Sequence, residues 1–101
     1  MFKARIEVTL KSKILDPQGK AIESSLHNLG FAKLGSVRTG KNIDVSVDES
    51  DAQRAAALVQ SACTKLLANP VTEEYECELF DESGKTVTKF SSRQPKGKIA
   101  S

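Results

Sequence analysis

"MFKARIEVTL", residues 1–10, places an apolar side chain at every second position. Alternation with a period of two is typical of a β-strand that buries one face and exposes the other. The same alternation interrupts the continuous apolar core that a secretory signal peptide needs. No apolar run in the chain approaches the roughly 18 residues of a membrane-spanning helix. We therefore expect a strand over residues 2–10, no membrane partner and a cytoplasmic location.

A helix start follows this strand. Asp16 supplies a capping side chain and Pro17 suits the first helical position. Three apolar residues then recur at helical spacing: Ile22, Leu26 and Leu29. Gly30 follows them, at the position where a left-handed residue ends many helices. The pattern predicts a helix over residues 17–29, with His27 on its solvent side.

The remaining elements follow the same two periodicities. Residues 31–38 and 42–48 alternate and are expected to be strands, joined by a hairpin in which Gly40 takes a positive φ angle. A long helix is expected after the capping candidates Asp48, Ser50 and Asp51, and Asn69-Pro70 should end it. Its apolar stripe is Ala55, Leu58, Val59, Ala62 and Leu66. "VTEEYECELF", residues 71–80, is the last strand, with Val71, Tyr75, Cys77 and Leu79 pointing inward. Glu73 interrupts that alternation without a local reason.

The order strand, helix, strand, strand, helix, strand predicts an α+β protein. The simplest arrangement is a ferredoxin-like βαββαβ sandwich, an antiparallel sheet with both helices on one face. The last strand would lie beside the first, with the carboxylates of Glu74, Glu76 and Glu78 facing Lys3 and Arg5. We expect one domain over residues 1–82. Residues 83–101 would form an extension, with a turn at Ser83-Gly84, a short strand around Val87 and a mobile basic tail beyond Ser91.

The net positive charge of the chain comes from its last 21 residues, 81–101. The total is +2. Residues 1–80 hold ten Lys and Arg against eleven Asp and Glu, which gives −1, and residues 81–101 hold five against two, which gives +3. A folded part that is close to neutral does not suggest a nucleic-acid-binding face. The polar positions of the first strand and of residues 42–48 also lack the exposed aromatic residues on which RNA-recognition modules stack bases.

Catalytic and metal sites have little support in the sequence. A nucleophile–histidine pair would need His27, the only histidine, which is expected on a solvent face. Cys63 and Cys77 lack the spacing of a zinc site or of a disulfide framework, and we expect both to be reduced. The glutamates of the last strand are alternate residues on a solvent face, which are normally only solvated.

"VRTGK", residues 37–41, is the most polar short motif. It lacks the GxxxxGK[ST] spacing of a phosphate-binding loop. Local chemistry leaves two interpretations open: a tight turn with polar sides, or a turn that presents Arg38 and Lys41 to an acidic partner or phosphate.

Three segments, in order and spacing, resemble the PurS subunit of phosphoribosylformylglycinamidine synthase: "KILDPQGKAIESSLHNLGF" (13–31), "VRTGKNIDVSV" (37–47) and "CTKLLANPVTEEYE" (63–76). The resemblance covers about residues 2–80, and the segment after Ser83 goes beyond the usual family length. It implies a small, non-catalytic subunit of the ATP- and glutamine-dependent C–N ligase for the fourth step of purine synthesis.

In that family the subunit associates as dimers or higher oligomers. It bridges PurL, the synthetase, which uses ATP and magnesium, and PurQ, the glutaminase that releases ammonia. The resemblance therefore implies no cofactor, metal or catalytic residue on this chain. It implies a partner surface around the matching turns, comprising Arg38, Thr39, Gly40, Lys41, Asn69 and Pro70. A small-molecule-sensing regulatory domain of ferredoxin-like topology is the alternative, and it would show stabilisation by a metabolite with no partner present.

Overall fold

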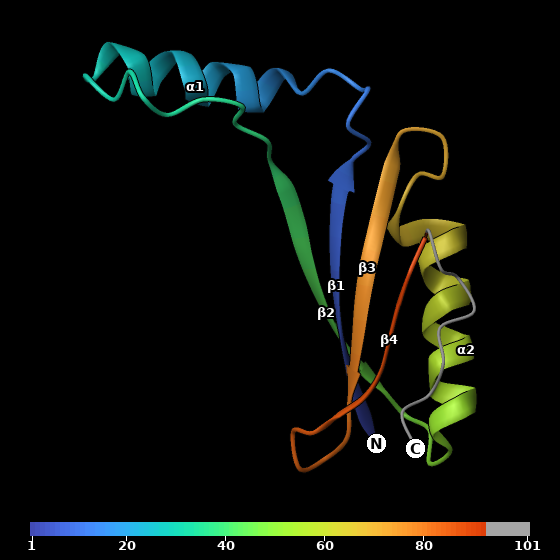
Figure 1. The fold of residues 1–101 in the computed structure, drawn as a ribbon. Coiled ribbons are helices and arrows are strands. Elements are labelled where there is room, and N and C mark those ends of the chain that lie inside the picture. The colour runs from blue at the N-terminus through green and yellow to red at the C-terminus, as the bar shows by residue number, and fades with distance from the viewer. Residues whose placement is uncertain (93–101) are drawn as a thin grey trace.

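The computed structural model describes residues 1–92 and shows one antiparallel sheet with two helices (Figure 1). Along the chain the elements are β1 (Phe2–Leu10), α1 (Pro17–Asn28), β2 (Gly40–Val47), α2 (Ala52–Ala62), the π-helical turn η1 (Cys63–Leu67), β3 (Glu73–Phe80) and β4 (Thr86–Ser91). The strand order in the sheet is β2-β1-β3-β4. The predicted α+β class, with the last predicted strand beside the first, is confirmed.

The register of the sheet sends alternate side chains to a buried and an exposed face. Ile6 lies opposite both Ile43 and Cys77 on the buried face. On the other face Arg5 lies between Asp44 and Glu78, as charge pairing favours. Lys3, expected to face a glutamate, lies opposite Phe80 instead. The buried core comprises Ala4, Ile6, Val8, Val47, Ala55, Val59, Cys63, Ala68, Tyr75, Cys77, Leu79 and Phe90.

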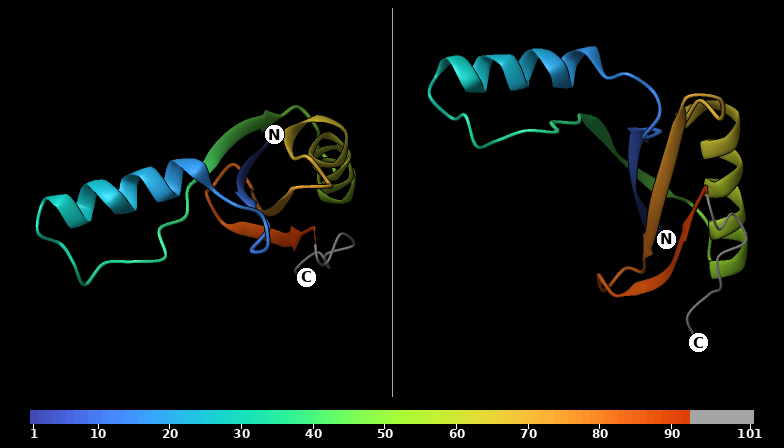
Figure 2. Two further views of the ribbon diagram at one scale, coloured as in Figure 1. Left: turned by 90° about the horizontal axis from the view of Figure 1, so that it is seen from above. Right: turned by 45° about the horizontal axis from the view of Figure 1, so that its top comes forward.

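Helix α2 covers one face of this sheet (Figures 1 and 2). The buried line of α2 and the π-helical turn runs through Ala55, Val59 and Cys63, and these small or slender side chains allow a close approach to the strands. The prediction that Leu58 and Leu66 belong to the buried stripe is wrong, since they are 55% and 82% exposed. In the π-helical turn the Ala68 N–H donates to the Cys63 carbonyl at 3.0 Å, so the buried line continues from Cys63 to Ala68, and Leu66 is exposed.

The predicted strand over residues 31–38 is wrong, and so is the placement of both helices on one face. Residues 31–38 run back along α1, and together they project beyond the end of the sheet (Figures 1 and 2). Two backbone groups of this return segment are bonded to α1 side chains instead of to a neighbouring strand. Glu23 Oε1 accepts from the Val37 N–H at 3.2 Å, and His27 Nε2 donates to the Leu34 carbonyl at 2.6 Å. We call residues 17–38 the arm.

Two smaller expectations also fail. Gly40 does not form a hairpin with a positive φ angle; it is the first residue of β2 and lies opposite Thr9. A Cβ atom at Gly40 would lie 2.7 Å from the Val8 carbonyl oxygen, so the position needs glycine for a close approach. Val71, expected inside, is 74% exposed because β3 begins only at Glu73.

Strand β4 completes the sheet in the region where a short strand around Val87 is predicted. It pairs with β3 from Glu76↔Ser91 to Phe80↔Thr86, with a bulge beside Phe80. Gly84 takes φ +88 in the connecting turn. The predicted basic tail lies outside the described residues, apart from its first position, Ser92.

Candidate partner-binding surface

Lys11, the first residue after β1, connects two turns that are far apart in the sequence. Its carbonyl oxygen accepts from Arg38 Nη2 at 3.0 Å, and its own Nζ donates to the Pro70 carbonyl at 2.9 Å. The Lys11 N–H also donates to the Thr72 carbonyl at 2.9 Å. The end of β1 therefore holds the 37–41 segment and the 69–72 turn side by side.

Glu73 makes a second connection at the same end of the sheet. One carboxylate oxygen accepts from the Asn69 N–H at 2.7 Å, and the other lies 3.9 Å from Lys41 Nζ. Asn69 shapes the turn itself, since its side-chain oxygen accepts from the Val71 N–H at 3.0 Å. We call Lys11, Arg38, Lys41, Asn69 and Pro70 the turn surface. Its three cations, Lys11, Arg38 and Lys41, lie beside the carboxylates of Glu73 and Glu74, which leaves a net charge of +1.

The structure places the six predicted partner residues in two groups. Four of them are exposed and lie together in the turn surface: Arg38, Lys41, Asn69 and Pro70. Thr39 is turned toward Asp16, and Gly40, which has no side chain, lies opposite Thr9 of β1 in the sheet. Sequence reasoning missed Lys11, which carries no signal of its own. Glu73 did carry one, because it is the residue that interrupts the alternation of β3.

The base of the arm is fixed by the carboxylate of Asp16. Oδ1 accepts from the Gly19 N–H at 2.9 Å, while Oδ2 accepts from the Thr39 N–H at 2.6 Å and from its hydroxyl at 2.9 Å. The N–H groups of Thr39 and Gly19 lower the pKa of Asp16 below its ordinary value. Both ends of the arm therefore meet at one side chain that is 3% exposed. Gly19 is required there, because a Cβ atom would lie 2.3 Å from the Val37 carbonyl oxygen.

The rest of the arm has a polar seam and an apolar surface. Glu23 and His27 hold the return segment at the seam, and the Val37 N–H lowers the pKa of Glu23. Gly30, at φ 99, ends α1 as the sequence predicts, with the Phe31 N–H bonded to the Leu26 carbonyl at 2.9 Å. The large apolar residues of the arm and its base that remain exposed are Leu15, Ile22, Leu29, Phe31 and Leu34.

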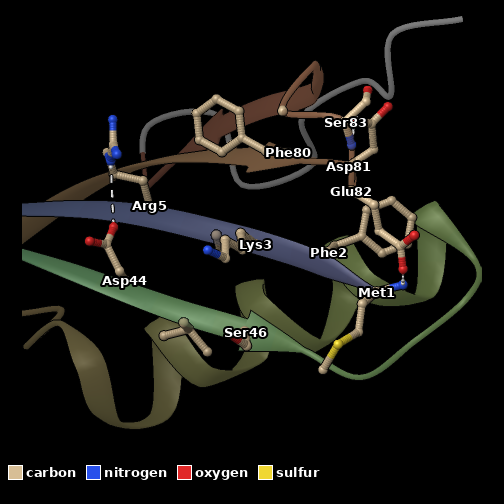
Figure 3. Close-up of a pocket in the computed structure, with 13 residues that line it drawn as sticks. Met1, Phe2, Lys3, Arg5, Asp44, Ser46, Phe80, Asp81, Glu82 and Ser83 are labelled. Carbon is tan, nitrogen blue, oxygen red and sulfur yellow. Dashed lines mark hydrogen bonds and ion pairs between the residues drawn. The ribbon is translucent and has the colours of Figure 1, made fainter.

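A groove of about 760 Å³ lies at the opposite end of the sheet, on the face that α2 does not cover (Figure 3). Four of its charged groups form two ion pairs. Arg5 lies 3.5 Å from Asp44 with its guanidinium 5.7 Å from the centroid of the Phe80 ring, and the N-terminal amino group lies 3.1 Å from Glu82. The alternative of a small-molecule sensor would need a ligand site of about this size.

Within residues 1–92 there is no group of three or more residues that could hold a metal ion. No helix in this part of the chain is long and apolar enough to cross a membrane. Burial raises the pKa of Cys63 to about 11 and that of Cys77 to about 12, and both thiols are free. Neither thiol is therefore activated as a nucleophile.

Fold and surfaces thus define a small α+β protein with an antiparallel sheet, a basic turn surface and an exposed apolar arm. The family model for PurS, phosphoribosylformylglycinamidine (FGAM) synthase, matches residues 3–82. The PurS subunit of Bacillus subtilis is 39% identical over 79 residues, 78% of this chain and 93% of the relative. That of Methanocaldococcus jannaschii is 37% identical over 78% of this chain and 95% of the relative.

Solved structures of PurS subunits are similar to this chain as well. B. subtilis PurS superposes with a TM-score of 0.72 at 37% identity, covering 80% of this chain and all of that one. PurLQS from Thermotoga maritima gives a TM-score of 0.72 at 37% identity, covering 78% of this chain and 96% of the matched chain. The chain belongs to the PurS family, the PurS subunit of FGAM synthase.

Proposed function

We propose that this chain bridges the PurL synthetase and the PurQ glutaminase in the cytoplasm and supports transfer of ammonia from glutamine to formylglycinamide ribonucleotide. Membership of the PurS family carries this proposal, and the PurLQS structure of T. maritima is a relative in which the three subunits are named together. Two free, buried cysteines are in keeping with a reducing compartment. ATP and magnesium act on PurL, and this chain supplies no catalytic group.

The turn surface is the proposed contact with one of these two partners. Arg38 and Lys41 come from one segment and Asn69 and Pro70 from another, yet Lys11 and Glu73 hold them at one end of the sheet. Exposed cations at the rim of an interface mainly steer and orient a partner. A partner with an acidic patch is therefore the expected occupant.

The arm is proposed as the site of self-association into a dimer or a higher oligomer. The Cα radius of gyration is 16.3 Å, against about 13 Å for a compact chain of this length, because the arm extends away from the core. Exposed apolar residues that cluster in this way normally mark an interface. A second copy can cover them by reciprocal packing of the two arms.

The test compares glutamine-driven and ammonia-driven amidine formation by the host's PurL and PurQ, with and without this chain. We expect glutamine-driven turnover to require the chain and ammonia-driven turnover by PurL to be independent of it. The double variant Arg38→Ala/Lys41→Ala should weaken the glutamine-driven rate, whereas Lys85→Ala, an exposed cation at the other end of the sheet, should not. If the chain changes neither rate and elutes with neither subunit, the bridging role is wrong.

A further inference from the structure

Strand β4 is an addition to the span shared with the family. The family model ends at residue 82, and the complete B. subtilis chain is covered by 80% of this one. Thr86–Ser91 lies beyond that span but forms the fourth strand of the same sheet. In a chain that ended near residue 82, β3 would be an edge strand.

The added strand is integrated into the core. Phe90 is 6% exposed and Thr88 is 2% exposed. The Phe90 ring packs edge-on against Tyr75, with centroids 6.4 Å apart and an interplanar angle of 84°. Lys89, on the outer face, lies 4.0 Å from Glu78. An exposed β3 would offer unpaired backbone groups to another chain, and β4 occupies them within the same molecule.

We infer that β4 is an intramolecular edge cap, which keeps a second copy from pairing with β3 and leaves β2 as the one free edge of the described sheet. Eight residues, Gly40–Val47, form that free edge without a proline. Sheet-to-sheet association of this chain is thus limited to β2, whereas a chain without β4 has two edges open to a second copy. The inference is independent of the proposed bridging role.

The backbone pattern supplies a matched pair of variants. The Ser92 N–H donates to the Tyr75 carbonyl at 3.0 Å, and bonded and non-bonded pairs alternate along an antiparallel ladder. The amides of Thr88 and Phe90 therefore point to β3, and the amide of Lys89 points to the open side. Thr88→Pro removes a ladder bond, while Lys89→Pro places proline where an edge strand tolerates it.

The experiment measures molar mass by sedimentation over a range of concentrations, with amide exchange of Cys77 and Leu79, whose N–H groups face β4. Thr88→Pro is expected to raise the limiting mass about two-fold over wild type, with the two amides protected only in the larger species. Lys89→Pro should match wild type. Adding a peptide of residues 85–92 should return Thr88→Pro to the wild-type mass.

Unchanged mass in a folded Thr88→Pro, with fast exchange at Cys77 and Leu79, would overturn the inference. Irreversible aggregates that the peptide does not dissolve would overturn it as well. If circular dichroism shows that Thr88→Pro does not fold, Phe90→Ser, which keeps the backbone bonds but removes the anchoring ring, is judged by the same mass and exchange criteria.

Discussion

Replacing Phe90 by alanine tests whether β4 contributes to the stability of the hydrophobic core. Phe90 is 6% exposed and contacts the Tyr75 ring, so the substitution leaves a cavity beneath the added strand. Such a change costs about 3–5 kcal/mol in a core. A chain of this size has a free energy of unfolding of roughly 5–15 kcal/mol, so the loss is a large share of the total. The expected fall in Tm is roughly 12–40 °C.

Phe31→Ala is the matched control, because it removes the same atoms from a ring that is 53% exposed on the arm. In the dissociated protein its cost should stay below about 0.5 kcal/mol. Both variants are compared with wild type by urea unfolding and by thermal scans, at a concentration low enough for sedimentation to show monomer. At higher concentration Phe31→Ala should weaken self-association, whereas Phe90→Ala should lower stability at every concentration.

A Tm of Phe90→Ala within about 4 °C of wild type would refute the reasoning, because that shift corresponds to less than about 1 kcal/mol. It would mean that β4 detaches at little cost and that the core closes without it. Equal losses from Phe90→Ala and Phe31→Ala at low concentration would show that the arm is packed within one chain and would remove the argument for association through it.

Three further predictions concern groups that the structure fixes in place. The folded pKa of Asp16 lies below its ordinary 3.8, so its stabilising bonds are complete above that pH and are lost as the pH falls through the folded value. Asp16→Asn should be less stable than wild type at neutral pH, and its Tm should depend less steeply on pH in acid. Parallel curves of Tm against pH for the two proteins would contradict this. Because burial raises the pKa values of Cys63 and Cys77 to about 11 and about 12, the native protein should react slowly with a thiol reagent at about pH 8, and both thiols should react at once in denaturant. Gly40→Val would place Cβ 2.7 Å from the Val8 carbonyl, so chemical shifts should report disturbed β1–β2 pairing, and an unchanged spectrum would show that the strand edge yields easily.

The sheet was predictable because a strand that is buried on one face alternates apolar and polar residues in its sequence. Ile6 and Cys77 sit on alternating stretches whose apolar positions can face only one core, and the charges of Arg5 and Glu78 favour the pairing that is found. The start and end of α1 were predictable from local capping signals, Asp16 and Gly30. The end of α2 was not, because the π-helical turn over Cys63–Leu67 has no such signal.

The arm was not predictable from alternation, because its apolar residues do not face this chain's core. Phe31 and Leu34 suggested a buried strand, yet they are 53% and 48% exposed. Pattern reasoning assumes that an apolar side chain is covered within the same molecule, and a surface that is covered by another molecule produces the same pattern. The turn surface could be predicted only in part, since the contact between its two segments depends on Lys11, whose role arises only from where β1 ends.

The arrangement of the two proposed surfaces carries a mechanical consequence. Asp16 and Thr39 close the base of the arm, and Arg38, next to Thr39, reaches the Lys11 carbonyl in the turn surface. Movement of the arm about this base would therefore shift Arg38 relative to Asn69 and Pro70. A second copy that fixes the arm would in turn fix the geometry that the turn surface offers to a partner. Self-association and partner binding should then be coupled: Phe31→Ala, at the turn that follows α1, should weaken the binding of PurL or PurQ at concentrations where it dissociates the oligomer. Partner affinity that is the same for the dissociated variant and for the associated wild type would show that the two surfaces act independently.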